Sequence, residues 1–412
     1  MGEPGGARPR RIRGWILRGL LGALFLLLGA VLALVALAWE AMGRAPSGER
    51  ARRMRASPHW SEGEFQNTQP MWNDVGGWFS SWSEMSDYAE ADWEFPVQPD
   101  TAERLARPAG PLRVTWLGHS TLVIELAGKR VLTDPVFGES PFPIPSLGPQ
   151  RWYAPPLPLQ ALRDVDAVLI SHDHYDHLDH PTIARMADWD TTFITPLGVG
   201  AHLQYWGIDP ARIVELDWWQ EHALGELRIV CTPSRHASGR QVFDQMRTLW
   251  SGYALIGPER RAMFSGDTGL FDDMATIGER YGPFDLVMIE VGAYHRTWPD
   301  WHIGPEQALV GHRMLHGELF LPIHWGLFNL ALHGWTEPVE RVWAAAEKLD
   351  VPIVTPRPGQ VIDVDHPPAP QRWWPERPFQ TAAEAPIVST RSGDPAHRYP
   401  DPLAATDRLA DR

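Results

Sequence analysis

The sequence predicts an α/β fold built as a layered sandwich, and two observations support this. From Leu112 onward, short apolar runs first follow one another as hairpin strands and then alternate with helical stretches, an order that favours stacked layers over a barrel. One run, residues 167–170, is apolar throughout and leads directly into a His-rich loop, as expected of a buried strand that carries a site.

The elements are expected in the following order. Residues 121–126 and 130–133 are joined by Ala127-Gly128-Lys129, whose length and glycine favour a tight hairpin turn. The other strands are expected at 114–117, 167–170, 193–195, 213–216, 227–232, 251–256, 261–264, 286–289 and 319–322, and the helices at 181–187, 305–315 and 338–349. From about residue 367 the chain is rich in Pro and charge, which predicts a loosely packed or disordered tail.

Composition limits the function. The chain has 412 residues, so one large domain with appendages, or two domains, is expected. Its net charge of −14 argues against a nucleic-acid-binding surface. Cys231 is the single cysteine, which excludes an intramolecular disulfide and a thiolate zinc site. Any metal must therefore be held by His, Asp or Glu.

The N-terminus resembles a membrane anchor. A basic tail, residues 1–18, precedes the uncharged run Gly19–Trp39, whose 21 residues would span about 31 Å as a helix. A cleaved signal peptide is the alternative, because Ala36-Leu37-Ala38 resembles a cleavage site, but the run is longer than a usual signal core. Four Arg lie within ten residues before the run and only Arg44 within ten after it. The positive-inside rule then places the N-terminus in the cytoplasm and the rest of the chain outside it.

Residues 40–110 form a polar extension without clear periodicity, marked by Trp60, Trp72, Trp78, Trp82 and Trp93. The favoured interpretation is an irregular segment packed on the main domain. The alternative is an aromatic surface that faces a membrane, since Trp suits the interface between lipid and water.

The stretch Ser171–His177 contains the pattern His-x-His-x-Asp-His directly after the buried strand. Alternate residues of extended backbone project to the same side, so His172 and His174 can approach one metal while Asp176 and His177 approach a second. Four His and three Asp fall within the nine residues from His172 to His180, which argues against a polar loop that is His-rich by chance.

Three further candidates follow in loops after expected strands. His236 comes 59 residues after His177, Asp267 comes 31 later, and His324 comes another 57 later. Taken singly, each has an ordinary interpretation as a loop His, a turn or helix-capping Asp, and a core His. Their joint order after His-x-His-x-Asp-His is the informative feature.

That order resembles the metallo-β-lactamase superfamily over roughly residues 111–366. Within it, several stretches are similar to the branch of the N-acyl-phosphatidylethanolamine-hydrolysing phospholipases D. They are 116–121 (Trp-Leu-Gly-His-Ser-Thr), 132–137 (Leu-Thr-Asp-Pro-Val-Phe), 215–219 (Glu-Leu-Asp-Trp-Trp), 282–286 (Gly-Pro-Phe-Asp-Leu), 291–294 (Val-Gly-Ala-Tyr), 302–306 (His-Ile-Gly-Pro-Glu) and, upstream, 65–67 (Phe-Gln-Asn). Leu327 departs from a Thr in the branch, and the segment between Tyr294 and His302 is shorter than in the phospholipase.

The resemblance implies an αββα sandwich with two metal ions at one edge of the sheets. It implies that the first metal is held by His172, His174 and His236, the second by Asp176, His177 and His324, and that Asp267 bridges them. Nitrogen and carboxylate ligands without thiolate suit Zn²⁺, two per chain, and iron and manganese are the alternatives that the same ligand types allow.

The resemblance also suggests further roles. Asp176, Asp267 and His302 are the candidate catalytic residues, with His302 in contact with substrate. His119 is expected to be a structural hydrogen-bonding His rather than a ligand, and Asp173 and Asp179 to orient ligand imidazoles. Tyr175, Tyr294, Trp218 and Trp219 are expected to pack, and Cys231 to lie in a strand near the site.

The expected function is a membrane-anchored dinuclear-zinc hydrolase of phospholipids, in which a metal-activated hydroxide attacks a phosphodiester. A lactone, thioester or amide hydrolase is the alternative, because hydroxide attacks an acyl carbon equally well. A non-catalytic metal-binding membrane protein is the alternative of another class, which the presence of all seven candidate ligands disfavours. Fold alone does not decide between these chemistries.

Overall fold

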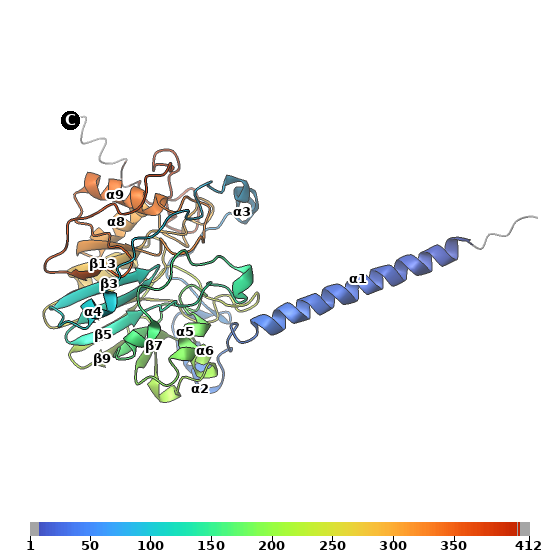
Figure 1. Ribbon diagram of the computed structural model, residues 1–412, viewed down its shortest axis with the longest axis horizontal. Helices are drawn as coiled ribbons and strands as arrows, with labels where there is room; N and C mark the ends of the chain where they lie inside the picture. The colour runs from blue at the N-terminus through green and yellow to red at the C-terminus, as the bar shows by residue number, and fades with distance from the viewer. Residues whose placement is uncertain (1–7, 402, 404–412) are drawn as a thin grey trace, which may run out of the picture.

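The computed structural model describes residues 8–401 and 403, and it contains two mixed β-sheets packed face to face between layers of helices (Figure 1). The seven-stranded sheet has the order β15-β3-β4-β5-β6-β7-β8, and the six-stranded sheet has the order β14-β13-β12-β11-β10-β9. The inner faces of both sheets share one hydrophobic core, which includes Ile124 from one sheet and Leu255 from the other. The predicted layered α/β sandwich is confirmed.

The strands are short and mostly buried on both faces. Their bounds are β3 Leu112–Gly118, β4 Thr121–Leu126, β5 Lys129–Thr133, β6 Ala167–Leu169, β7 Thr192–Pro196, β8 Ile213–Leu216, β9 Glu221–Leu224, β10 Leu227–Thr232, β11 Gly252–Ile256, β12 Arg261–Phe264, β13 Phe284–Glu290, β14 Gly317–Ile323 and β15 Val361–Asp363. Neighbours β5, β6, β7 and β8 run parallel, as do β12, β13 and β14. Parallel neighbours bring their carboxyl ends to one edge, and the polar loops follow there.

Helices cover the outer faces of the sheets. On the seven-stranded sheet lie α5 (His180–Arg185) and α6 (Gly200–Tyr205), whose Ile183 and Leu203 pack against strand residues. The six-stranded sheet is covered by α7 (Asp273–Tyr281), α8 (Pro305–Met314) and α9 (Glu337–Leu349). These two helix layers complete the αββα arrangement.

All eleven expected strands and all three expected helices form, with ends shifted by a few residues. The sequence analysis missed strands β9 and β15 and helices α6 and α7. It also missed the elements of the extension, which are α2 (Gly48–Ala56), β1 (Trp60–Ser61), β2 (Glu64–Phe65), α3 (Val75–Ser81) and α4 (Thr101–Leu105). These elements are short, and their apolar periodicity is too brief to separate from a loop.

The extension and the C-terminal segment are both integrated into the domain. Arg235 and Asp300 form a fully buried ion pair with Oδ2 to Nη2 at 3.0 Å. Asp300 also accepts from the backbone N–H of Trp72 at 2.7 Å and of Thr390 at 2.6 Å. One carboxylate thus ties the extension, the C-terminal segment and a loop of the domain together. Most of the described tail is exposed or half-buried, while Trp374, Ile387, Ser389, Thr390 and Tyr399 are buried. Residues 402 and 404–412 lie outside the described residues.

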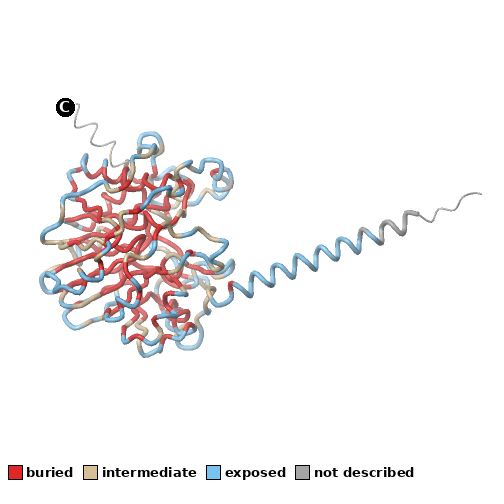
Figure 2. The backbone as a smooth tube through the Cα atoms, viewed as in Figure 1, coloured by how far each residue is buried: buried red, intermediate tan, exposed pale blue. Residues whose placement is uncertain are grey.

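Helix α1 (Arg8–Ala38) projects away from the domain (Figures 1 and 2). Its segment Leu17–Ala38 is long and apolar enough to cross a membrane, and every described residue from Leu17 to Leu37 is solvent-exposed. Residues 1–7 of the expected basic tail lie outside the described residues. Where α1 ends, residues 40–44 turn onto the domain beside α6, and the Trp206 indole N–H donates to the Glu40 carbonyl at 2.7 Å.

The buried ion pair predicts a large stability effect. Asp300→Ala leaves the Arg235 guanidinium buried without its carboxylate, so the free energy of unfolding should fall by about 3–5 kcal/mol. Asp188→Ala is the matched control, because its partner Arg163 is exposed and solvent screens that pair. Urea unfolding followed by tryptophan fluorescence measures both. Equal midpoints for the two variants would contradict the clamping role of Asp300.

Candidate metal centre

Polar side chains from six loops converge at one edge of the sandwich. His172, His174, Asp176 and His177 follow β6, His236 follows β10, and Asp267 follows β12. His119 lies in the turn between β3 and β4, while Glu290 ends β13 and His324 follows β14. The structure therefore brings together all seven residues that the sequence analysis proposed as ligands, and adds His119 and Glu290 to the same cluster.

The first set consists of three imidazoles. His172 Nε2 lies 2.9 Å from His174 Nδ1, and His236 Nε2 lies 3.3 Å from the same atom. All three inward nitrogens fall within 4.8 Å of one another. This is the set that the resemblance assigns to the first metal.

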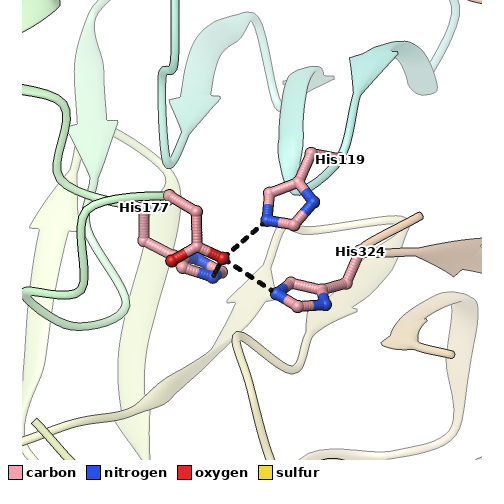
Figure 3. Close-up of side chains that lie close together, drawn as sticks. His119, His177 and His324 are labelled. Atoms are coloured by element: carbon pink, nitrogen blue, oxygen red, sulfur yellow. Dashed lines mark hydrogen bonds and ion pairs between the residues drawn. The ribbon is translucent and has the colours of Figure 1, made fainter. Parts of the chain in front are cut away.

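The second set surrounds one carboxylate oxygen. Asp176 Oδ2 lies 2.9 Å from His119 Nε2, 3.2 Å from His324 Nε2 and 3.3 Å from His177 Nε2. Figure 3 shows His119, His177 and His324 pointing toward this carboxylate from three different loops. His119 and His324 both have positive φ, 53° and 64°, which side-chain-bearing residues rarely adopt. Strained backbone of this kind is common at functional sites.

Asp267 lies between the two sets. Its Oδ2 is 3.1 Å from both His177 Nε2 and His324 Nε2, and 3.7–3.8 Å from His236 Nε2 and His172 Nε2. The preceding Gly266 has φ +57°, and a Cβ there would lie 2.7 Å from Ser171 Cβ. Glycine at this turn allows the Asp267 loop to approach the His172 loop closely.

The hydrogen bonds of the Nδ1 atoms, which point away from the cluster, indicate which ring nitrogen of each ligand histidine faces a metal. His172 Nδ1 donates to Ser171 Oγ at 2.9 Å, because that hydroxyl already donates to Asp134 at 2.6 Å. His177 Nδ1 donates to Asp134 at 2.8 Å, and His236 Nδ1 donates to the Trp301 carbonyl at 2.8 Å. With its Nδ1 proton held outward, the neutral form of each of these three imidazoles can offer an Nε2 lone pair to a cation in the cluster.

The cluster fits metal cations. Inward lone pairs and carboxylates this close repel one another unless positive charge lies between them. Within the described part of the chain, the buried atoms His177 Nε2 and Asp267 Oδ1 have no hydrogen-bond partner. Imidazole and carboxylate donors without thiolate match zinc and other first-row metals.

The pKa directions of the clustered imidazoles express the same demand for positive charge. Burial lowers the pKa of His324, but Asp267 and Asp176 outweigh burial and raise that pKa to about 10. Burial likewise lowers the pKa of His177, and Asp267, Asp176 and Asp134 together raise it well above its ordinary value. The surrounding carboxylates thus favour positive charge at the positions of both imidazoles.

The sequence analysis missed the two carboxylates that orient the cluster. Asp134 holds His177 directly and His172 through Ser171. Glu290 Oε2 accepts from His302 Nδ1 at 2.8 Å and lies 3.6 Å from His324 Nδ1. Burial and the charge of Asp267 raise the pKa of Glu290 well above its ordinary value. Asp134 directly follows strand β5, and Glu290 is the last residue of strand β13. An acidic residue at the end of an apolar strand is the sequence feature that could have identified both.

Asp173 and Asp179 do not orient ligand imidazoles as expected. Asp173 accepts hydrogen bonds from the Gly239 N–H and the Thr248 hydroxyl, both at 2.7 Å. The imidazole that lies beside its carboxylate is that of His202, which is not one of the proposed ligands. Asp179 caps α5 and accepts from the Thr182 N–H at 3.2 Å. Both stabilise the loop that carries the cluster rather than its ligands.

Several expectations about neighbouring residues agree with the structure. Tyr294 is buried, and its hydroxyl donates to Glu337 at 2.7 Å. Trp218 is buried against Trp250, and Cys231 lies in β10, where burial raises the pKa of its thiol. The Asn67 amide accepts from the His236 N–H at 3.1 Å and donates to the His236 carbonyl at 2.8 Å, a contact that the sequence analysis missed.

His302 stands between the cluster and an apolar cavity of about 350 Å³. The cavity is lined by Asn73, Asp74, Val75, Trp78, Ala293, Thr297, Trp298, Trp301, His302 and Leu330. Burial lowers the pKa of His302 to about 4, so its imidazole is neutral at pH 7. The segment between Tyr294 and His302, which departs from the phospholipase branch, supplies three of the residues that line the cavity, Thr297, Trp298 and Trp301.

Known proteins resemble this chain in sequence. A model described as the beta-lactamase superfamily domain matches residues 129–325. An uncharacterized protein of Mycobacterium tuberculosis is 43% identical over 334 residues, which are 77% of this chain and 87% of the relative. The N-acyl-phosphatidylethanolamine-hydrolyzing phospholipase D 1 of Caenorhabditis elegans is 35% identical over 257 residues, 60% of this chain and 72% of that protein.

A solved structure shares the fold. The isothiocyanate hydrolase from Delia radicum gut bacteria superposes with a TM-score of 0.50 at 23% identity. The match covers 61% of this chain and 98% of that one. At this identity the match shows a shared fold.

The position of Asp267 between both sets predicts the result of removing it. Loss of a hydrogen-bonding partner behind a ligand typically weakens metal affinity about 10–100-fold. Asp267→Ala would remove a ligand itself, so it should weaken zinc affinity by more than that. Elemental analysis after dialysis against zinc gives the metal content per chain. Asp190→Ala, on the exposed surface, is the control and should bind as the unmodified chain does. Full metal content in a folded Asp267→Ala protein would refute the assignment.

Proposed function

The chain belongs to the beta-lactamase superfamily and is a metal-dependent hydrolase, and we propose that it cleaves phosphodiesters of N-acylated phosphatidylethanolamine-type lipids as a phospholipase D. The proposed cofactors are two zinc ions, one on His172, His174 and His236, the other on Asp176, His177 and His324. Asp267 would contact both. The phospholipase relative from Caenorhabditis elegans supports the substrate class.

The observation that carries this proposal is the apolar cavity beside the cluster. Three indoles, from Trp78, Trp298 and Trp301, and the side chain of Leu330 line it, while His302 forms its boundary toward Asp267. A cavity with this lining suits an acyl chain, and its position places the chain's polar end at the ligand set. A small polar substrate would leave these apolar walls without a role.

The chain's own residues orient the reaction. Bound zinc ions would stabilise the phosphate oxygens and acidify a water molecule. Glu290 and the Trp301 carbonyl fix the rings of His302 and His236 through their Nδ1 atoms. That leaves His302 Nε2 as the ring nitrogen available to a substrate group. The buried, closely packed surroundings of Asp267 limit the water that competes for the site.

Helix α1 is proposed to be an uncleaved membrane anchor, with the domain outside the cytoplasm. Its apolar segment is exposed along its length, whereas a core helix would be buried. Residues 40–44, which follow it, are held on the domain by defined hydrogen bonds, including Arg44 N–H to His202 Nδ1 at 3.0 Å. A short, ordered connection of this kind would hold the site near the lipid surface.

The proposed reaction is tested with the full chain, loaded with zinc, in mixed micelles of detergent and N-acylated phosphatidylethanolamine in H₂¹⁸O. We expect phosphatidic acid that carries ¹⁸O and an unlabelled N-acylethanolamine, because water attacks phosphorus and the alkoxide leaves with a proton. Mass spectrometry measures both products. Asp267→Ala controls for contaminating lipases and should give neither.

The same assay separates the alternative chemistry. A lactone and a thioester of matched chain length are added in parallel reactions. Hydrolysis of these acyl substrates, with no phosphatidic acid from a chain that holds its metals, would overturn the phospholipase proposal and favour an acyl hydrolase.

A further inference from the structure

Loop 240–246, which follows the His236 loop, carries two of the most exposed apolar side chains of the domain. Val242 is 81% exposed and Phe243 is 91% exposed. Exposing a valine and an adjacent phenylalanine to water is unfavourable. Such a pair at a loop tip indicates that the tip binds an apolar surface of another molecule or of a membrane.

The loop is built to hold this tip outward. Asp244 Oδ1 accepts from the backbone N–H of Arg240 at 3.0 Å and of Gln241 at 2.7 Å, which closes a turn around the tip. At the base, the Met246 N–H donates to the Ser238 carbonyl at 3.1 Å. The apolar tip is therefore the end of an ordered turn with a fixed base.

The base of the loop lies directly beside the end of helix α1. Arg240 donates from Nε and Nη2 to the Ala41 carbonyl at 2.9 and 2.7 Å. The same guanidinium donates from Nη1 to the Asp173 carbonyl at 2.7 Å, between His172 and His174 of the metal cluster. One side chain thus connects the exit of α1, the base of the loop and the cluster's main loop.

A second apolar loop flanks the same place. Phe142, which is half-exposed, lines a cavity of about 190 Å³ together with Leu37 of α1, Arg240 and Tyr175. Leu147, further along that loop, is also exposed. Leu37 and Phe142 thus share one cavity with Arg240, at the base of loop 240–246. Figure 1 shows that α1 leaves the domain near helices α5 and α6.

We infer that loop 240–246 is a second contact with the lipid bilayer, in which Val242 and Phe243 enter the membrane beside α1. This inference rests on the proposed membrane anchor, because continuity with the apolar helix identifies the occupant as lipid rather than another protein. Two contacts restrict rotation about a single helix, so the loop holds the cluster-bearing edge toward the bilayer.

A fluorescent probe on the loop tests this. Cys231 is buried, so a cysteine introduced at Gln241 is the accessible site for a thiol-reactive, environment-sensitive dye, and it leaves Val242 and Phe243 in place. The full chain is reconstituted into phosphatidylcholine vesicles with and without brominated acyl chains. The control dye is placed at Glu226, in the turn between β9 and β10. Alkaline carbonate extraction reports separately whether α1 is inserted.

We expect blue-shifted emission and bromine quenching at position 241 and neither at 226, with the quenching lost in the Val242→Ser/Phe243→Ser variant. No quenching at 241 in a chain that resists extraction would overturn the loop contact and leave the anchor intact. Quenching that survives the serine pair would also overturn it. If alkaline carbonate removes the chain from the vesicles while the dye at position 241 is quenched, the anchor would be refuted and the loop would remain a peripheral membrane contact. Extraction without quenching would refute both.

Discussion

The convergence of unprotonated imidazole nitrogens and carboxylates on one small volume is the constraint on which the rest of the structure depends. His172, His177 and His236 direct their Nε2 atoms inward because Ser171, Asp134 and the Trp301 carbonyl accept hydrogen bonds from their Nδ1 atoms. Without positive charge between them, these groups repel one another. The sandwich supports this arrangement by bringing the carboxyl ends of strands from both sheets to a single edge.

The extension and the C-terminal segment hold the cluster as well. Asn67 of the extension fixes the backbone of His236 through both its amide oxygen and its amide nitrogen. Asp300 joins the extension and the C-terminal segment to Arg235, the residue before His236. The extension also supplies Trp78 to the apolar cavity. These appendages therefore shape both the ligand geometry and the substrate side of the site.

Much of the fold could be predicted because buried strands are short apolar runs, and the eleven strands and three helices expected in the domain all formed. The ligand candidates could be found because four of them lie within six residues. Their partners could not: Asp134 is 43 residues from His177, and Asn67 is 169 residues from His236. A single buried Asp or Asn in a loop has no local pattern that identifies what it will contact. Helices α6 and α7 were missed because tertiary packing stabilises them more than their short amphipathic pattern does.

The central claim is that two metals lie side by side with Asp267 between them. Anomalous X-ray diffraction at the absorption edge of zinc, from crystals of the metal-loaded chain, tests it most directly. The account predicts two anomalous peaks, one among His172, His174 and His236 and one among Asp176, His177 and His324, both in contact with Asp267. A single peak, or peaks away from Asp267, would contradict it.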